Sequence, residues 1–181
     1  SVIFALLVPN QYQASTLLAP AQQDAGGITG AMGQLGGLAS LTGISLGDGE
    51  GNESQMAMEI MQSRNFIEDF IKNNGIEVEV FAADGWSAKT NQLSIDDSLY
   101  DIDTQTWVRN PPSGKPLKPT GWELYEKFID VYAVTQDKKS GMINVSVEYY
   151  SPILAKEWSE KLVDAINSYM QARKLQQVNR N

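Results

Sequence analysis

The chain has neither cysteine nor histidine among its 181 residues. Without cysteine it can form no disulfide, no thiolate nucleophile and no cysteine-ligated zinc or iron–sulfur site. Without histidine it lacks the commonest general base and metal ligand, which excludes triads of the Ser-His-Asp and Cys-His types. Only 14 basic residues stand against 22 acidic ones, a net charge of −8. Nucleic acid is therefore not expected as a partner, because basic side chains must neutralise its phosphates.

Long apolar runs are also scarce. No stretch reaches the roughly 20 apolar residues of a membrane-spanning helix. The first eight residues (SVIFALLV) are apolar after Ser1, and no basic region precedes them as in a signal peptide. This run reads either as a β-strand or as the remnant of a longer hydrophobic segment. The helical pattern near Asn181 has no terminating Gly or Pro, so we expect a fragment of a longer protein.

The sequence pattern of the first part of the chain predicts a strand, a loop and a helix. Residues 12–19 (YQASTLLA) hold β-forming residues between two prolines and predict a strand. The segment 26–51 holds ten of the fifteen glycines and predicts a compact loop. A helix is expected from Asn52, with Gln55 as the second member of a capping box, to the Asn-Asn-Gly at 73–75.

The centre of the chain predicts one strand and one irregular region. Residues 76–82 (IEVEVFA) alternate apolar and acidic side chains, which is typical of a half-buried strand. Residues 84–119 contain a proline-rich run, which forbids a regular element there. Thr120 then begins a short helix, with Glu123 completing a capping box.

The last third predicts a hairpin and a long helix. Residues 131–135 and 142–150 read as two strands joined by turn chemistry, with one face buried. Ser151 caps a helix with Pro152 at its first position, running to about residue 178. The predicted class is α+β: a small mixed or antiparallel sheet packed with helices forms a base domain at 1–151, and residues 152–181 start a long, truncated helical arm.

Candidate chemistry is sparse. Asp101 and Asp103 superficially resemble the acidic pair of sugar-nucleotide enzymes or the start of a calcium loop, but the distal Glu of that loop is missing, so a solvated acidic loop is favoured. Arg64 reads as an anion ligand, a subunit contact, or a partner of Glu68 one turn along a helix. No catalytic constellation emerges, so we expect no enzyme, cofactor or metal.

The four tryptophans divide into two pairs. Trp122 and Trp158 fall in helical stripes and are expected in the core. Trp86 and Trp107 fall in predicted loops and are the candidate platform for a glycan ligand, with Arg109 nearby as a basic contact.

Residues 57–70 contain the pattern "A…I..SR.F", and residues 151–167 contain the pattern "SP..A..W...LV..IN". In these blocks the chain resembles the periplasmic part of the Wzz-type chain-length determinants, the polysaccharide co-polymerase family. The residues that carry the resemblance are Tyr12, Ala14, Ser63, Arg64, Phe66, Tyr100, Asp101, Trp107, Arg109, Pro152, Ala155, Trp158 and Asn167.

The resemblance implies a protein of the bacterial inner membrane whose periplasmic base lies near the bilayer. Copies would assemble into a ring-like homo-oligomer that sets the length of a surface polysaccharide, the O-antigen of lipopolysaccharide. Its partners would be a Wzy-type polymerase and a lipid-linked polysaccharide, and no enzymatic activity goes with this part. The alternative is a polysaccharide-binding or export co-polymerase module for capsule or exopolysaccharide. The family's two membrane helices are missing here, apart from the apolar run at 1–8.

Overall fold

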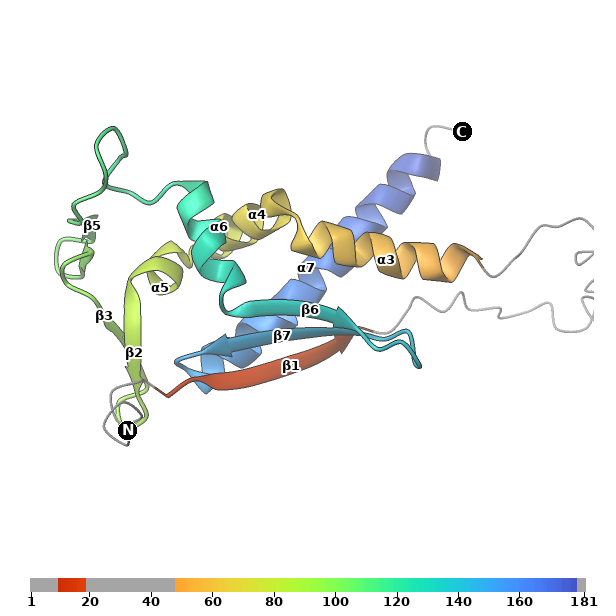
Figure 1. Cartoon of the computed structure of the whole chain (residues 1–181), viewed down its shortest axis with the longest axis horizontal. Coiled ribbons are helices and arrows are strands. Elements are labelled where there is room, and N and C mark those ends of the chain that lie inside the picture. Colours follow the sequence, from red (N-terminus) through yellow and green to blue (C-terminus); the bar gives the residue numbers. More distant parts are fainter. Residues whose placement is uncertain (1–9, 19–47, 179–181) are drawn as a thin grey trace, which may run out of the picture.

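The computed structural model describes residues 10–18 and 48–178 (Figure 1). The apolar run at 1–8, most of the glycine-rich segment and the last three residues lie outside the described residues. In the described part, small antiparallel sheets pack with helices and a long helix comes last, which confirms the predicted α+β class.

The main sheet has three antiparallel strands in the order β1-β7-β6. Strand β1 spans Tyr12–Leu18, β6 spans Tyr132–Gln136 and β7 spans Ile143–Tyr149. In the register Ala14 faces Val147, and Val147 in turn faces Tyr132. Each strand alternates between a core face and a polar face, as expected of a sheet covered on one side. The predicted β1 strand and β6–β7 hairpin are confirmed.

The turn of that hairpin is held by Asp137. Its Oδ1 accepts hydrogen bonds from the backbone amides of Lys139 and Ser140, at 2.9 and 2.7 Å. Gly141 follows with a φ of 71°, a conformation that glycine adopts without steric cost. The sequence pattern at 136–141 therefore acts as the turn chemistry predicted.

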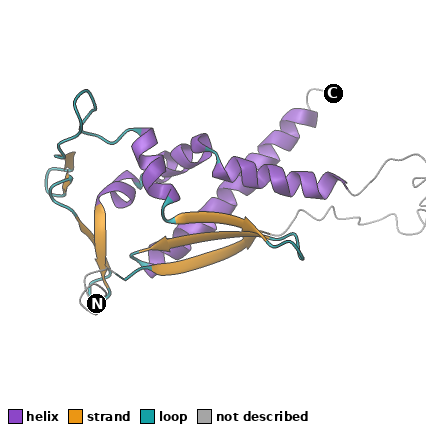
Figure 2. Ribbon diagram, in the orientation of Figure 1, coloured by secondary structure: helices purple, strands orange, loops and turns teal. Residues whose placement is uncertain are grey.

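Helix α7, Pro152–Val178, covers the core face of the sheet and then continues past it (Figures 1 and 2). The amide of Leu154 donates to Ser151 Oγ at 3.3 Å, which confirms Ser151 as the cap. Thr16 on β1 and Ser159 on α7 share a hydrogen bond of 2.9 Å. The helix has 27 residues, which makes it about 40 Å long.

The distal half of α7 also contacts its own chain. Lys174 pairs with Glu53 on helix α3 at 3.0 Å, with both side chains about half exposed. Tyr169 and Leu175 remain exposed at 48% and 66%. This polar end of α7 projects beyond the sheet, and Lys174 joins it to α3 (Figure 1).

Two helices stand where one was expected. Helix α3 spans Asp48–Gln62 and α4 spans Arg64–Asn74, so the predicted start at Asn52 was wrong and the helix covers the last glycines of the predicted loop. The break occurs because Ser63 has an extended backbone and its hydroxyl accepts from the amide of Phe66, as an N-cap does. Gly75 ends α4 with a φ of 64°.

Residues 76–82 form a helix, not the predicted strand. Helix α5 spans Glu77–Ala82. The amide of Ile76 bonds to the carbonyl of Ile71 and the amide of Val80 to that of Ile76, so the chain turns straight into a new helix after α4. An alternating pattern specifies a strand only where a neighbouring strand can pair with it, and α5 packs on helix α6 instead.

The region expected to be irregular contains four short strands. Strands β2 (Ala83–Ser87) and β3 (Gln92–Ile95) form one hairpin. Strands β4 (Tyr100–Asp101) and β5 (Thr106–Trp107) form a second. The expectation was therefore wrong for 84–107, whereas the proline-rich run at 110–119 contains no helix or strand, as predicted.

Helix α6, Gly121–Ile129, begins as predicted with a complete capping box of Thr120 and Glu123. It sits beside α4 and α5 (Figure 1). Its inner face contributes Leu124 and Phe128, which are 5% and 0% exposed.

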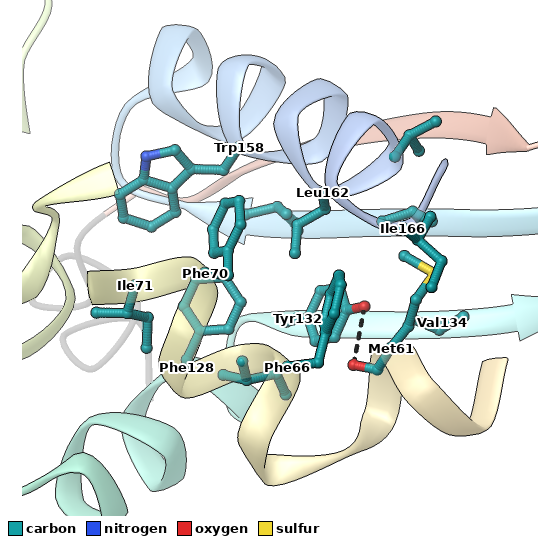
Figure 3. Packing of buried hydrophobic residues seen from close by; sticks show 14 of the residues in the cluster. Met61, Phe66, Phe70, Ile71, Phe128, Tyr132, Val134, Trp158, Leu162 and Ile166 are labelled. Carbon is teal, nitrogen blue, oxygen red and sulfur yellow. Dashed lines mark hydrogen bonds between the residues drawn. The ribbon is translucent and has the colours of Figure 1, made fainter. Parts of the chain in front are cut away.

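The core lies between the sheet and the helices (Figure 3). Trp158 of α7 is its largest side chain, 1% exposed, and its ring lies 4.5 Å from that of Tyr149 and 5.9 Å from that of Phe128. The buried hydroxyl of Tyr132 donates to the carbonyl of Met61 at 3.4 Å. The first four turns of α7 therefore belong to the same core as the sheet.

Replacing Trp158 by alanine should leave a large cavity in this core. The expected loss is about 3–5 kcal/mol of unfolding free energy, measured by urea denaturation. The matched control is Ile153→Ala on the same helix, where the side chain is 53% exposed and the expected change is within about 0.5 kcal/mol. Equal losses in the two variants would contradict this assignment of Trp158.

Candidate functional site

Arg109 and Glu123 form a buried ion pair beneath the proline-rich run. Their side chains are only 6% and 11% exposed. The pair is bidentate, with Nη1 2.9 Å from Oε1 and Nη2 3.1 Å from Oε2. Such fork-to-fork pairing gives both strength and a fixed orientation.

The same guanidinium also holds the proline-rich run. Its Nε donates to the carbonyl of Leu117 at 2.6 Å and its Nη2 to that of Pro116 at 2.9 Å. The Cζ atom of Arg109 lies 5.0 Å from the centre of the Phe81 ring, in cation–π contact. Arg109 thus connects the end of β5, the run at 110–119, α5 and α6.

The Glu123 carboxylate also accepts hydrogen bonds from Thr120. Its Oε2 accepts from the amide and the hydroxyl of Thr120, at 2.9 and 2.8 Å. The hydrogen bonds from Arg109, followed by that from the Thr120 backbone, hold the pKa of the Glu123 carboxyl far below its usual range. The carboxylate therefore stays ionised and fixes the first turn of α6.

Next to Glu123 in the chain, Trp122 forms an exposed contact with Arg64, between α6 and α4. The Arg64 guanidinium carbon lies 5.2 Å from the centre of the Trp122 ring. Arg64 Nε also bonds to Glu68, which confirms the predicted pairing one helical turn apart. A Cβ at Gly121 would lie 2.7 Å from the Glu68 carboxyl carbon, so the Glu68 carboxylate packs directly against the start of α6.

Trp122 does not lie in the core, and that prediction was wrong. It is 46% exposed, whereas Trp158 is buried as predicted. The buried face of α6 is defined by Leu124 and Phe128, and Trp122 lies on the other side of the helix together with Ile129, which is 42% exposed. A short aromatic stripe does not by itself say which way it faces.

Trp86 and Trp107, the predicted glycan platform, are half-buried in short strands. Trp86 meets Tyr12 edge-on at 5.7 Å and donates its ring N–H to Asn91. Trp107 packs edge-on against Tyr100 at 5.0 Å and against Phe81 at 5.8 Å. The structure does not bring the two predicted platform residues together with a solvent-facing Arg109, because that side chain points inward.

The acidic stretch forms turns. Asp96 Oδ1 accepts from the amide and hydroxyl of Ser98, and Asp101 Oδ1 accepts from the amides of Asp103 and Thr104. These hydrogen bonds lower the pKa of both carboxyls, chiefly through Ser98 for Asp96 and Thr104 for Asp101. Nowhere in the described ranges do three or more acidic side chains gather in a way that could hold a metal ion.

The other residues of the resemblance are divided between the core and the surface. Ser63 caps α4, and Phe66, Ala155 and Trp158 lie in the core. The remaining ones lie at the surface or partly buried: Tyr12, Ala14, Tyr100, Pro152 and Asn167. Sequence reasoning missed Glu123 as the partner of Arg109, although its place in a capping box was already visible.

Among residues 10–18 and 48–178, no helix combines the length and the apolar character that crossing a bilayer requires. No family model matches the sequence, and no curated protein matches it either.

Replacing Arg109 by methionine should remove the bidentate partner of the buried Glu123 carboxylate and leave Lys115, which is 44% exposed and 3.5 Å away, as its remaining cation. We expect a loss of about 3–5 kcal/mol of unfolding free energy in urea denaturation, typical of breaking a buried pair. The control is Lys118→Met, which removes an ion pair to Glu77 whose lysine is 58% exposed and should cost about 1 kcal/mol or less. A cost for Arg109→Met no larger than that of the control would refute a buried, stabilising pair.

The lowered pKa of Glu123 also predicts a pH dependence. A carboxyl whose pKa is lower in the folded state stabilises the fold above its unfolded pKa, near 4.5, and that stabilisation declines as the pH falls below this value. Urea denaturation at pH 6 and pH 3 should therefore show a smaller acid-induced loss for Glu123→Gln than for the unmodified chain. Glu77→Gln is the matched control and should keep the full loss. An identical loss in all three proteins would rule out Glu123 as a source of the acid sensitivity.

Proposed function

We propose that this chain is a protomer of an oligomeric scaffold that regulates the chain length of a bacterial surface polysaccharide, the O-antigen of lipopolysaccharide. The proposal is carried by the sequence blocks that resemble Wzz-type chain-length determinants, above all the block at 151–167. In this role the chain lies in the periplasm, acts with a Wzy-type polymerase at the inner membrane and catalyses no reaction itself.

The placement of the matching residues supports a structural role. The serine and phenylalanine of the "SR.F" block cap and bury the start of α4, through Ser63 and Phe66. The alanine and tryptophan of the last block anchor α7 in the core, through Ala155 and Trp158. Residues that fix helices relative to a sheet suit a protein that works by holding a shape.

The long α7 supports assembly. Ile166 is its last fully buried core residue, Met170 still packs against the core, and Tyr169 and Leu175 are exposed on its distal half. Exposed apolar side chains on a projecting helix are surface that a neighbouring copy can cover. A ring requires a heterologous contact, in which this surface meets a different one on the next copy.

A second candidate is a module that binds the polysaccharide directly, in capsule or exopolysaccharide export. The exposed contact of Trp122 with Arg64 favours it, because an open aromatic ring beside a guanidinium can hold a sugar. Both candidates place a glycan beside this protein.

The test is deletion of the full-length gene in the source bacterium, followed by electrophoresis of its surface polysaccharide. We expect the preferred chain length to vanish while polysaccharide is still made, because a regulator controls length and not synthesis. The intact gene and an Ile153→Ala variant should restore the ladder. An unchanged ladder would refute the proposal, as would loss of all polysaccharide.

A further inference from the structure

We propose that Arg64, Trp122 and Tyr125, here called the Trp122 surface, form a binding site for one or two sugar rings of a polysaccharide. The inference rests on the proposed function for the identity of the ligand and adds the site at which the chain holds it. Four observations lead to it: an exposed aromatic ring, a fixed guanidinium beside it, a rigid foundation and a small extent.

The aromatic ring is the first observation. Trp122 is 46% exposed although α6 has a buried face of its own. The Tyr125 ring lies 5.6 Å away, inclined by 37°, so the two rings form a shallow angled surface. The C–H groups on one face of a pyranose ring carry partial positive charge and pack on the electron-rich face of an indole.

Arg64 supplies the polar contact. The Cζ atom of Arg64 lies 5.2 Å from the Trp122 ring centre, and the Arg64 side chain is half exposed. Nε is engaged by Glu68, while the two Nη groups have no hydrogen-bond partner among the residues that the structure describes. They are free to donate to sugar hydroxyls or to the carboxylate of an acidic sugar, for which a guanidinium is well suited.

The foundation of this surface is rigid. The buried Arg109–Glu123 pair and the Thr120 cap fix the first turn of α6, on which Trp122 lies. Helices α4 and α6 pack on each other, and the Glu68 carboxylate of α4 lies against Gly121 at the start of α6. A site whose side chains are already held in place loses little entropy on binding.

The extent of the surface selects the ligand. A stable contact with a second protein buries about 800 Å² on each partner, from some 20–30 residues. The Trp122 surface consists of three side chains, Ile129 on the same side of α6 is also exposed, and the charged Glu68 and Glu126 adjoin the surface in sequence. This is too little for a protein partner by itself and fits one or two sugar rings.

The test uses the indole N–H signals of the ¹⁵N-labelled chain in NMR. The probe is surface polysaccharide from the source bacterium, freed of lipid by mild acid, with dextran as the unrelated polysaccharide. We expect the Trp122 signal to shift saturably with the probe and not with dextran, while the signals of Trp86, Trp107 and Trp158 stay in place.

Variants separate binding from folding. Trp122→Phe and Arg64→Gln alter exposed side chains and should keep the thermal midpoint, but each should weaken binding by about tenfold or more. Trp86→Phe is the matched control and should bind as the unmodified chain does. Shifts at Trp86 or Trp107, or no shift at millimolar probe, would overturn the site.

Two further outcomes are decisive. If sedimentation shows that the chain self-associates and Trp122→Phe abolishes this without a glycan shift, the surface belongs to a second copy and the inference is wrong. If deletion of the gene changes the glycan ladder but no shift occurs, only this site is refuted. A saturable shift with an unchanged ladder would refute the length-regulating function and keep the site.

Discussion

Burying a guanidinium costs free energy unless hydrogen-bond and ion-pair partners surround it. This requirement determines how the segments around Arg109 are arranged. Around Arg109, carbonyls of the proline-rich run accept hydrogen bonds, the Phe81 ring of α5 lies against the guanidinium, and the first turn of α6 supplies Glu123. Helix α5 packs on α6, whereas the proline-rich run is neither helix nor strand. The buried charge and its hydrogen bonds join this run to both helices.

Helix α6 connects the surroundings of Arg109 to the main core. Its inner side places Phe128 against Trp158 and Tyr132, so the helix is part of the main core. Its outer side carries Trp122 toward solvent and toward Arg64. Because one short helix has both roles, the position of the exposed ring is tied to the packing of the sheet and α7.

The sequence predicted those elements whose signals are local. The turn at 136–141, the Thr120 capping box and the Ser151-Pro152 start of α7 each depend on contacts within a few residues, and all three are present. Local pattern failed at 76–82, where packing on α6 replaced strand pairing. It also failed at Trp122, because the direction of a helix face is set by what covers it. The Arg109–Glu123 pair joins residues 14 apart across several prolines, and its formation depends on the path of that run.

The uninterrupted course of α7 has a mechanical consequence. No glycine lies between Pro152 and Val178, and the only proline is at the first position, so the helix has no built-in hinge where it leaves the core. Its last twelve residues extend about 18 Å beyond Ile166 at 1.5 Å per residue. A tilt of about ten degrees at Trp158 and Leu162 would thus carry the far end at least about 3 Å sideways. A helix without a hinge transmits a rotation at its packed end as a larger displacement farther along, and in this chain the Lys174–Glu53 pair with α3 opposes such a displacement.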